Sequence, residues 1–358
     1  MAKERGFGRF MAWIGVGAAL ISFGAAVYEL LHAQGELRER RRIVAEQIAG
    51  GETELAAGAF PAAWESLQRA GTTAEIDGLF AKLLGGLSGE RQTVRAAQED
   101  LAMNWLRSSR ATEGQTLGDL ADKLTNTLAT GANAARDQRQ ADLLAHLGWA
   151  YFLKHRSGDL NVMPDEPYRR AVAVDANNPY AHVFWGHWIL WNRGSLEEAR
   201  EHFAAALKTG RARTEVRYFQ LAALANVHSD AAEAEWLRVV EDMRENGEPL
   251  NASIKNDLYD RYYFALNARE NRDALLAAIG AEKQLELQRM LLDWNDLEPH
   301  KKHVVKALGA LTLEAASRRD EALAAWRGLL AETGSEPNST VAERARHEIE
   351  RLSRGAPR

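Results

Sequence analysis

Two distant stretches of the chain carry one pattern, with every spacing preserved. Gly58, Phe60, Ala63, Leu67 and Ala70 match Gly194, Leu196, Ala199, Phe203 and Ala206. The pattern is typical of a turn glycine, an apolar residue that docks the turn, and a helix with small, large and small residues along one face. Such repetition predicts a helical solenoid, in which each antiparallel helix pair stacks on the next. A solenoid favours a surface that binds other proteins over a pocket for chemistry.

The composition supports an all-α chain and excludes several classes of partner and site. The 358 residues suffice for two ordinary domains or one repeat array, and only 8 are proline. With 45 basic and 50 acidic residues, the net charge of −5 provides no basic field for nucleic acid, so we expect no nucleic-acid partner. The absence of cysteine from the sequence rules out disulfides, thiolate metal sites and a cysteine nucleophile.

An uncharged run from Phe10 to Tyr28 predicts a transmembrane helix over residues 10–31, after a short tail at residues 1–9. About 20 such residues cross the hydrocarbon core of a bilayer. Trp13 and Tyr28 lie near its two ends, where aromatic rings act as membrane anchors. We expect a single-pass protein of the inner (plasma) membrane of a bacterium.

Three features of this segment leave alternatives open. A cleaved signal peptide, with its cleavage site at Gly24-Ala25-Ala26, is the competing interpretation. Basic residues flank the two ends of the predicted span almost equally. The positive-inside rule therefore favours an extracytoplasmic or periplasmic location of the solenoid over a cytoplasmic one only slightly. Ala18, Ser22 and Ala26 form a small-residue face that predicts helix packing in the membrane and possible self-association.

The rest of the chain divides at glycine- and proline-rich breaks. Residues 32–51 are expected to form a juxtamembrane helix or linker that ends at Gly50-Gly51. Residues 52–353 are expected to form the solenoid of antiparallel helix pairs, and residues 354–358 a disordered tail. Ala342, Ala345, Ile349 and Leu352 make one apolar stripe, which predicts a terminal helix that covers the last open face of the solenoid.

The best-formed units, at residues 141–210, resemble the tetratricopeptide repeat (TPR) family. Leu144, Leu147, Gly148 and Tyr151 resemble the first helix of such a unit, and Tyr168, Ala171 and Pro179 its second helix and terminating proline. Weaker echoes occur at Ala232, Trp236 and Val239 and at Ala322, Trp326 and Leu329. One departure is the long connection from His155 to Pro167, for which contact with a partner and a tolerated insertion are both open.

The resemblance also implies where a partner would bind. In such units the concave wall is built from first-helix positions after the glycine and one turn beyond, which here places Trp149, Phe152, His187 and Trp191 in the groove. An aromatic-lined groove suits an apolar peptide or helix of a protein partner. The alternative is that these rings pack against neighbouring helices. Some members of the family bind the free carboxylate of a partner through lysine and asparagine at these positions. Here the positions after the glycines are Trp149 and His187, so this chain is not expected to recognise a free carboxylate.

Signatures of catalysis are missing from the sequence. It has no phosphate-binding loop, no nucleophile elbow and no zinc-binding helix of the known spacings. His300 and His303, with Glu298, resemble part of a metal site, but lysines separate them and no third histidine or cysteine is near, which favours a solvated helix start at Pro299. We therefore expect no catalytic, cofactor or metal residues, and no enzyme.

Together these features predict a membrane-anchored TPR-like scaffold or adaptor that binds a partner protein through an aromatic-lined concave surface. The alternative is an integral structural subunit of a larger membrane complex without an exchangeable ligand. An enzyme of unrecognised type is a remote third interpretation.

Overall fold

The chain is all-α in this computed structural model, which describes every residue except 1, 76–80, 83, 109–116, 335–339 and 355–358. For residues 2–22 it describes the backbone and not the side chains. The described ranges contain sixteen helices and no strand. They form two compact units, Met1–Ala181 and His182–Arg358, which are treated separately below.

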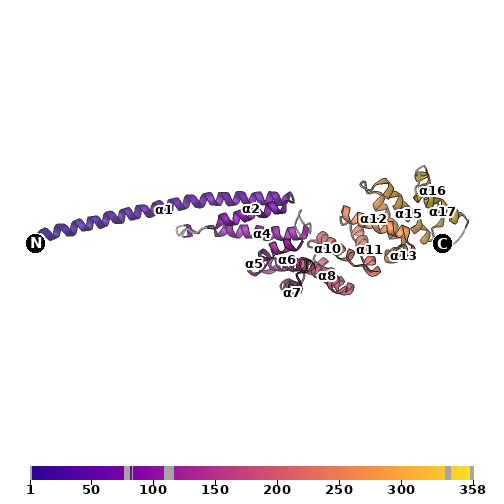
Figure 1. The fold of residues 1–358 in the computed structure, drawn as a ribbon, viewed down its shortest axis with the longest axis horizontal. Coiled ribbons are helices and arrows are strands. Elements are labelled where there is room, and N and C mark those ends of the chain that lie inside the picture. Colours follow the sequence, from indigo (N-terminus) through magenta and orange to yellow (C-terminus); the bar gives the residue numbers. More distant parts are fainter. Residues whose placement is uncertain (1, 76–80, 83, 109–116, 335–339, 355–358) are drawn as a thin grey trace. The chain divides into compact units, whose positions relative to one another are not determined.

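The first unit contains seven of these helices, the last of which continues into the second unit (Figure 1). They are α1 (Ala2–Ala56), α2 (Phe60–Ala74), α4 (Ser88–Ser108), α5 (Leu117–Ala134), α6 (Asp137–Arg156), α7 (Asp165–Val174) and α8 (Pro179–Arg193).

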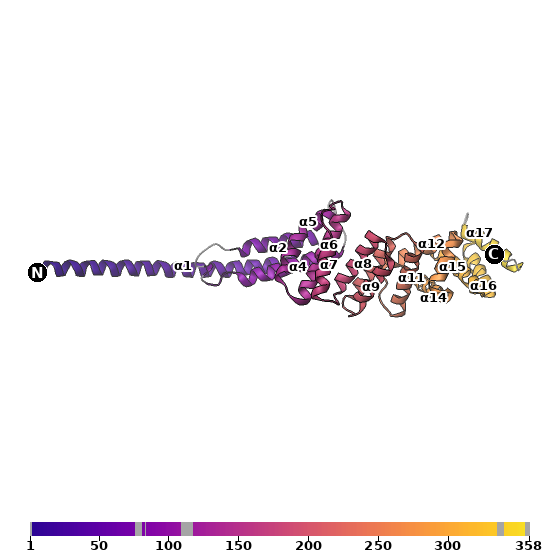
Figure 2. The same cartoon turned by 90° about the horizontal axis from the view of Figure 1, so that it is seen from below.

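Helix α1 continues unbroken through residues that the sequence suggested were separate elements. The expected tail, span and linker are one helix, and the break predicted at Gly50-Gly51 is wrong. Gly51 lies where α1 meets α2, and a β-carbon there would lie 3.2 Å from Leu67 Cδ2. The glycine therefore serves close helix packing instead of a turn. The C-terminal part of α1 lies alongside α2 in both views (Figures 1 and 2).

The prediction of a transmembrane helix at residues 10–31 is wrong, and with it the membrane-spanning part of the predicted fold class and the single-pass inner-membrane location; the all-α part of that class agrees with the structure. Within the described part of the chain, no helix is both long enough and apolar enough to cross a membrane. Neither the membrane as a partner nor self-association through this segment is supported by the described part of the chain.

Five residues were assigned roles in the predicted span, and the structure describes the side chains of two of them. The side chains of Trp13, Ala18 and Ser22 lie outside the described residues. Ala26 and Tyr28 are described, and both are exposed on α1. No observation tests the packing role of Ala26 or the anchoring role of Tyr28.

The repeated stripe has the structural meaning that its spacing predicts. Gly58 and Gly194 adopt φ values of 74° and 67°, the left-handed region that glycine tolerates best. The small, large and small residues that follow them on α2 and on α9 (Leu196–Leu207) are buried. Two other positions of the same kind, Trp236 and Trp326, are buried as well.

A glycine on the first helix of a pair lets the large residue of the second helix approach. On α6, a β-carbon at Gly148 would lie 2.4 Å from Tyr168 Cε1 of α7. On α8, a β-carbon at Gly186 would lie 2.8 Å from Phe203 Cε1 of α9. The repeat therefore encodes a contact between ring and backbone, and this contact sets the spacing of the two helices.

The second unit begins within α8 and continues to the C-terminus of the chain (Figure 2). After α9 it contains α10 (Arg213–Ala225), α11 (Asp230–Glu245), α12 (Ala252–Asn267), α13 (Arg269–Ile279), α14 (Ala281–Leu292), α15 (Pro299–Ala315), α16 (Arg319–Thr333) and α17 (Thr340–Ser353).

The order of contacts explains why the two weaker echoes of the repeat, at Ala232 and Ala322, lie far apart in the chain. Helix α12 packs against α13 and also against α15. Helix α14 is thus an additional element between two helix pairs, and it contacts α11, α13 and α15. At the end of the unit, α17 packs on α15 and α16 and buries Ala342, Ala345 and Leu352. Three of the four residues of the predicted apolar stripe are therefore buried, and Ile349 is half-buried.

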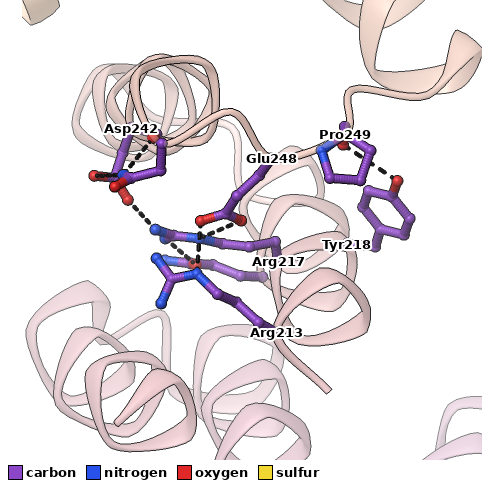
Figure 3. Close-up of polar contacts among 8 residues, drawn as sticks. Arg213, Arg217, Tyr218, Asp242, Glu248 and Pro249 are labelled. Atoms are coloured by element: carbon purple, nitrogen blue, oxygen red, sulfur yellow. Dashed lines mark hydrogen bonds and ion pairs between the residues drawn. The ribbon is translucent and has the colours of Figure 1, made fainter. Parts of the chain in front are cut away.

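A cluster of charged residues fastens α10 to the connection after α11 (Figure 3). Glu248 faces two guanidinium groups: its Oε1 lies 2.7 Å from Arg213 Nε, and its Oε2 lies 3.5 Å from Arg217 Nε. Arg217 also pairs with Asp242 on α11. Burial lowers the pKa of Arg217 from its ordinary value, against the effect of Glu248. The cluster holds a loop in place at one end of the unit.

Candidate partner-binding site

The two predicted groove residues of the first unit lie inside it. Trp149 is buried on α6, and its Nε1 donates a hydrogen bond to the carbonyl oxygen of Leu106 on α4, at 3.3 Å. Phe152 is buried beside it, with ring centroids 4.9 Å apart. Both rings pack within the unit.

The other two predicted residues lie in the second unit, on α8. His187 is buried, whereas Trp191 is 44% exposed and stacks on Trp188 with ring centroids 5.5 Å apart. Most of the aromatic residues of this helix, including Phe184 and Trp188, are core. The partner-binding role of the four residues stays a prediction. Of the four side chains, only that of Trp191 is exposed enough to favour it.

Two other features singled out in the sequence have simple structures. In the connection from His155 to Pro167, Leu160 and Met163 are exposed, and its contact with a partner stays a prediction. His300 Nδ1 lies 3.3 Å from Glu298, and His303 Nε2 lies 3.9 Å from Glu332, so the imidazoles face different carboxylates. Among the described residues, no group of three or more histidine, aspartate or glutamate side chains is placed to hold a metal ion.

A pocket of about 400 Å³ opens in the second unit between α10, α11, α12 and α13. We call it the α11–α13 pocket. Its walls come from the last turn of α10, from the connection with His228 and Ser229, and from one face each of the three helices that follow. The Ser229 side chain caps α11 by accepting a hydrogen bond from the Ala232 backbone N–H, at 3.2 Å. This cap fixes the first turn of α11 at the edge of the pocket.

The α11–α13 pocket is acidic. Asp230, Glu233 and Asp260 line it against a single guanidinium group, that of Arg261. Arg261 is already engaged, because its Nε lies 2.8 Å from Glu233 Oε1 and its guanidinium lies 3.8 Å above the centre of the Trp236 ring. The lining therefore has an excess of two carboxylates, Asp230 and Asp260, for a ligand to neutralise.

Exposed aromatic rings adjoin these carboxylates. Phe264 lines the α11–α13 pocket and is 61% exposed. Tyr263, its neighbour on α12, is 47% exposed, and the two rings meet edge to face with centroids 5.9 Å apart. Most other large aromatic side chains of this unit are buried. An exposed aromatic pair beside an acidic pocket can bind a segment that is both apolar and basic.

A pair of imidazoles, one buried and one half-buried, lies elsewhere in the unit, between α8 and α9. His182 Nδ1 and His202 Nδ1 are 3.0 Å apart, so one ring donates a hydrogen bond that the other accepts. Trp185 covers His202 with ring centroids 4.7 Å apart. Burial and the neighbouring imidazole lower the pKa of His202 from 6.5 to about 4, against the effect of Glu198.

Because of this shift, acid should destabilise the protein at the imidazole pair. Between pH 6.5 and about 4 the unfolded imidazole of His202 binds a proton that the folded one does not. The free energy of unfolding should therefore fall through that window, by about 2 kcal/mol after allowance for partial exposure. Urea titrations at the two ends of the window measure the loss. His202→Gln should flatten the dependence and His228→Gln, at an exposed histidine, should not. An equal slope in wild type and His202→Gln would contradict this origin.

Sequence reasoning missed the α11–α13 pocket because its walls come from four successive helices, and the sequence does not show how these helices pack against one another. The one available signal was the run of three adjacent rings Tyr262, Tyr263 and Phe264. A helix buries only one face, so three consecutive rings cannot all be core. Tyr262 is buried, and the next two rings are exposed.

Comparison with known proteins adds little to this geometry. No protein-family model matches the chain, and no curated protein matches it. Among solved structures that match is Nro1, a hypoxic regulator of sterol synthesis that is described as a nuclear import adaptor. The match covers 90% of this chain and 97% of that chain at 13% identity, with a TM-score of 0.31. A likeness at this level carries no argument about function.

Proposed function

We propose that the chain is a scaffold of TPR-like helix pairs that binds another protein through the α11–α13 pocket. The observation that carries the proposal is Phe264, an exposed ring on the wall of a pocket with excess negative charge. Rings of this kind supply a large share of the binding energy at protein interfaces.

The charge of the pocket indicates the kind of segment it accepts. Asp230 and Asp260 favour a lysine or arginine of the partner, and Phe264 favours an adjacent bulky apolar residue. Long-range attraction between opposite charges would speed association and make it sensitive to salt. We therefore propose a partner segment in which a basic residue lies next to an apolar one.

Binding of short labelled peptides to the full chain tests this function by fluorescence anisotropy. The peptides share a bulky apolar residue and differ in its neighbours, which are lysine, glutamine or glutamate. We expect the lysine peptide to bind best and to weaken as salt is added. Phe264→Ala should lower its affinity about tenfold or more, the effect of losing an aromatic anchor.

Trp191→Ala is the matched control, because Trp191 is also an exposed ring of the second unit and lies outside the pocket. It should leave the affinity unchanged. Loss of binding in Trp191→Ala with full binding in Phe264→Ala would move the site to the groove position expected from the sequence. Equal affinity for the lysine and glutamate peptides would refute the acidic pocket as the binding site.

A further inference from the structure

A second pocket of the same unit lies between α14, α15 and α16 and has a different character. Its volume is about 420 Å³, within the range of sites for small molecules. Apolar side chains make much of its wall: Leu285, Leu292, Val305, Ala310, Leu313 and Leu329. Gly309 and Gly328 also line it, and at Gly328 a β-carbon would meet nothing within 4 Å. The hollow exists partly because these helices lack side chains there.

A buried acceptor on the wall of this pocket has no partner among the described residues. Gln288 is 3% exposed, and its Oε1 makes no hydrogen bond. The same oxygen lies 3.2 Å from the position that a β-carbon of Gly309 would occupy, so it lies over the glycine that lines the pocket. Leaving a buried carbonyl oxygen without a donor is unfavourable.

The orientation of this amide follows from its other contact. Gln288 Nε2 lies 3.1 Å from Thr312 Oγ1, and the Thr312 hydroxyl already donates to the carbonyl oxygen of Leu308, at 2.9 Å. The Thr312 oxygen must therefore accept, which requires the amide nitrogen on its side and leaves the Gln288 oxygen towards Gly309.

Gln284, one turn earlier on the same helix, shows what a satisfied amide looks like. Its Nε2 donates to the carbonyl oxygen of Leu275 at 2.9 Å, and its Oε1 accepts from the Tyr262 hydroxyl at 2.8 Å. It is buried and does not line the pocket. Of two buried amides on α14, only the one at the pocket lacks a donor.

One cation on the wall of the pocket makes no ion pair with the described residues. Three cations and two carboxylates line the pocket. Lys306 pairs with Glu332, and Arg318 pairs with both Glu321 and Glu282. Within the described chain, Arg289 makes no ion pair, so its guanidinium is available to a ligand. The pocket thus combines an apolar wall, a buried acceptor and an available cation.

We infer that the α14–α16 pocket binds a small apolar carboxylic acid that also carries a hydroxyl or N–H group. The donor of the ligand satisfies Gln288 Oε1, the carboxylate pairs with Arg289, and the apolar body covers the leucine and valine wall. This site is separate from the acidic α11–α13 pocket, and it does not depend on the proposed protein-binding function.

The test uses straight-chain alkanoic acids of several lengths, each with and without a terminal hydroxyl, and the matching alkanols. Calorimetric titration of the full chain should show that the best hydroxy acid binds about fivefold more tightly than its unsubstituted partner, the gain of one neutral hydrogen bond. Several lengths are needed because the series itself selects the spacing between donor and carboxylate. Arg289→Gln should weaken both acids and leave the alkanols unchanged.

Two variants on α14 separate recognition from stability. Gln288→Met removes the acceptor that lacks a donor, so it should retain the fold and abolish the preference for the hydroxy acid. Gln284→Met breaks two good hydrogen bonds, so it should lower stability and keep the preference. Gly328→Leu, which fills the hollow, should abolish binding of all probes without unfolding the protein.

Three results would overturn the inference. The first is equal affinity of wild type for acids with and without the hydroxyl, which would mean that Gln288 Oε1 is satisfied by a water only. The second is a preference that persists in Gln288→Met. The third is the absence of binding at every chain length.

Discussion

Gly148→Ala is expected to lower the free energy of unfolding by about 3 kcal/mol, the upper part of the range for overpacked cores. A β-carbon there would lie 2.4 Å and 2.6 Å from two ring carbons of Tyr168, a residue with no exposed surface. The ring cannot move away without displacing α7 from α6. The gain in helix propensity, about 1 kcal/mol, offsets only part of this cost.

Gly50→Ala is the matched control, since Gly50 is also a helical glycine of the first unit and a β-carbon there would meet nothing within 4 Å. It should raise stability by about 0.5–1 kcal/mol. Chemical denaturation of both variants measures the contrast. If Gly148→Ala were as stable as Gly50→Ala, the ring–glycine contact would not set the helix spacing.

Glu248→Gln is expected to cost about 3 kcal/mol, because it removes a charge partner from a guanidinium group in the protein interior. The Arg217 and Glu248 side chains are only 6% and 9% exposed. Arg217 still pairs with Asp242 in this variant, so the loss of stability should be smaller than for a buried charge without any partner. Thermal or urea unfolding gives the change.

The control for this prediction is Glu235→Gln, which removes the carboxylate that pairs with Arg200 at 2.8 Å. Arg200 is 42% exposed, so the pair is screened by water and its loss should cost less than about 1 kcal/mol. Similar costs for the two substitutions would show that burial of Arg217 does not determine the energetics of the cluster in Figure 3.

The helix pairing could be predicted from the sequence because it depends on local periodicity. Gly58 and Gly194 require a left-handed turn, and the stripe that follows each glycine has one face to bury. Such information is contained in a dozen consecutive residues. Trp236 and Trp326, which lie in the weaker echoes of the same pattern, are buried as well.

The predictions that went wrong or stayed untested depend on contacts between distant residues. Gly51 was interpreted as a helix break because its contact with Leu67 could not be seen in the sequence. The uncharged run of α1 predicts a span, but no helix in the described part of the chain qualifies as one. The pattern along one helix does not reveal which rings the neighbouring helices cover, so the buried Trp149 on α6 and the exposed Trp191 on α8 cannot be distinguished from the sequence.

The central claim is that the α11–α13 pocket binds a basic and apolar segment of another protein, and a charge reversal tests it most directly. Asp260→Lys on the exposed side of α12 should abolish binding of the lysine peptide by the full chain. The same variant should lose the preference for the lysine peptide over the glutamate peptide, because its lining then holds two carboxylates and two cations. Unchanged preference for the lysine peptide in Asp260→Lys would contradict the account.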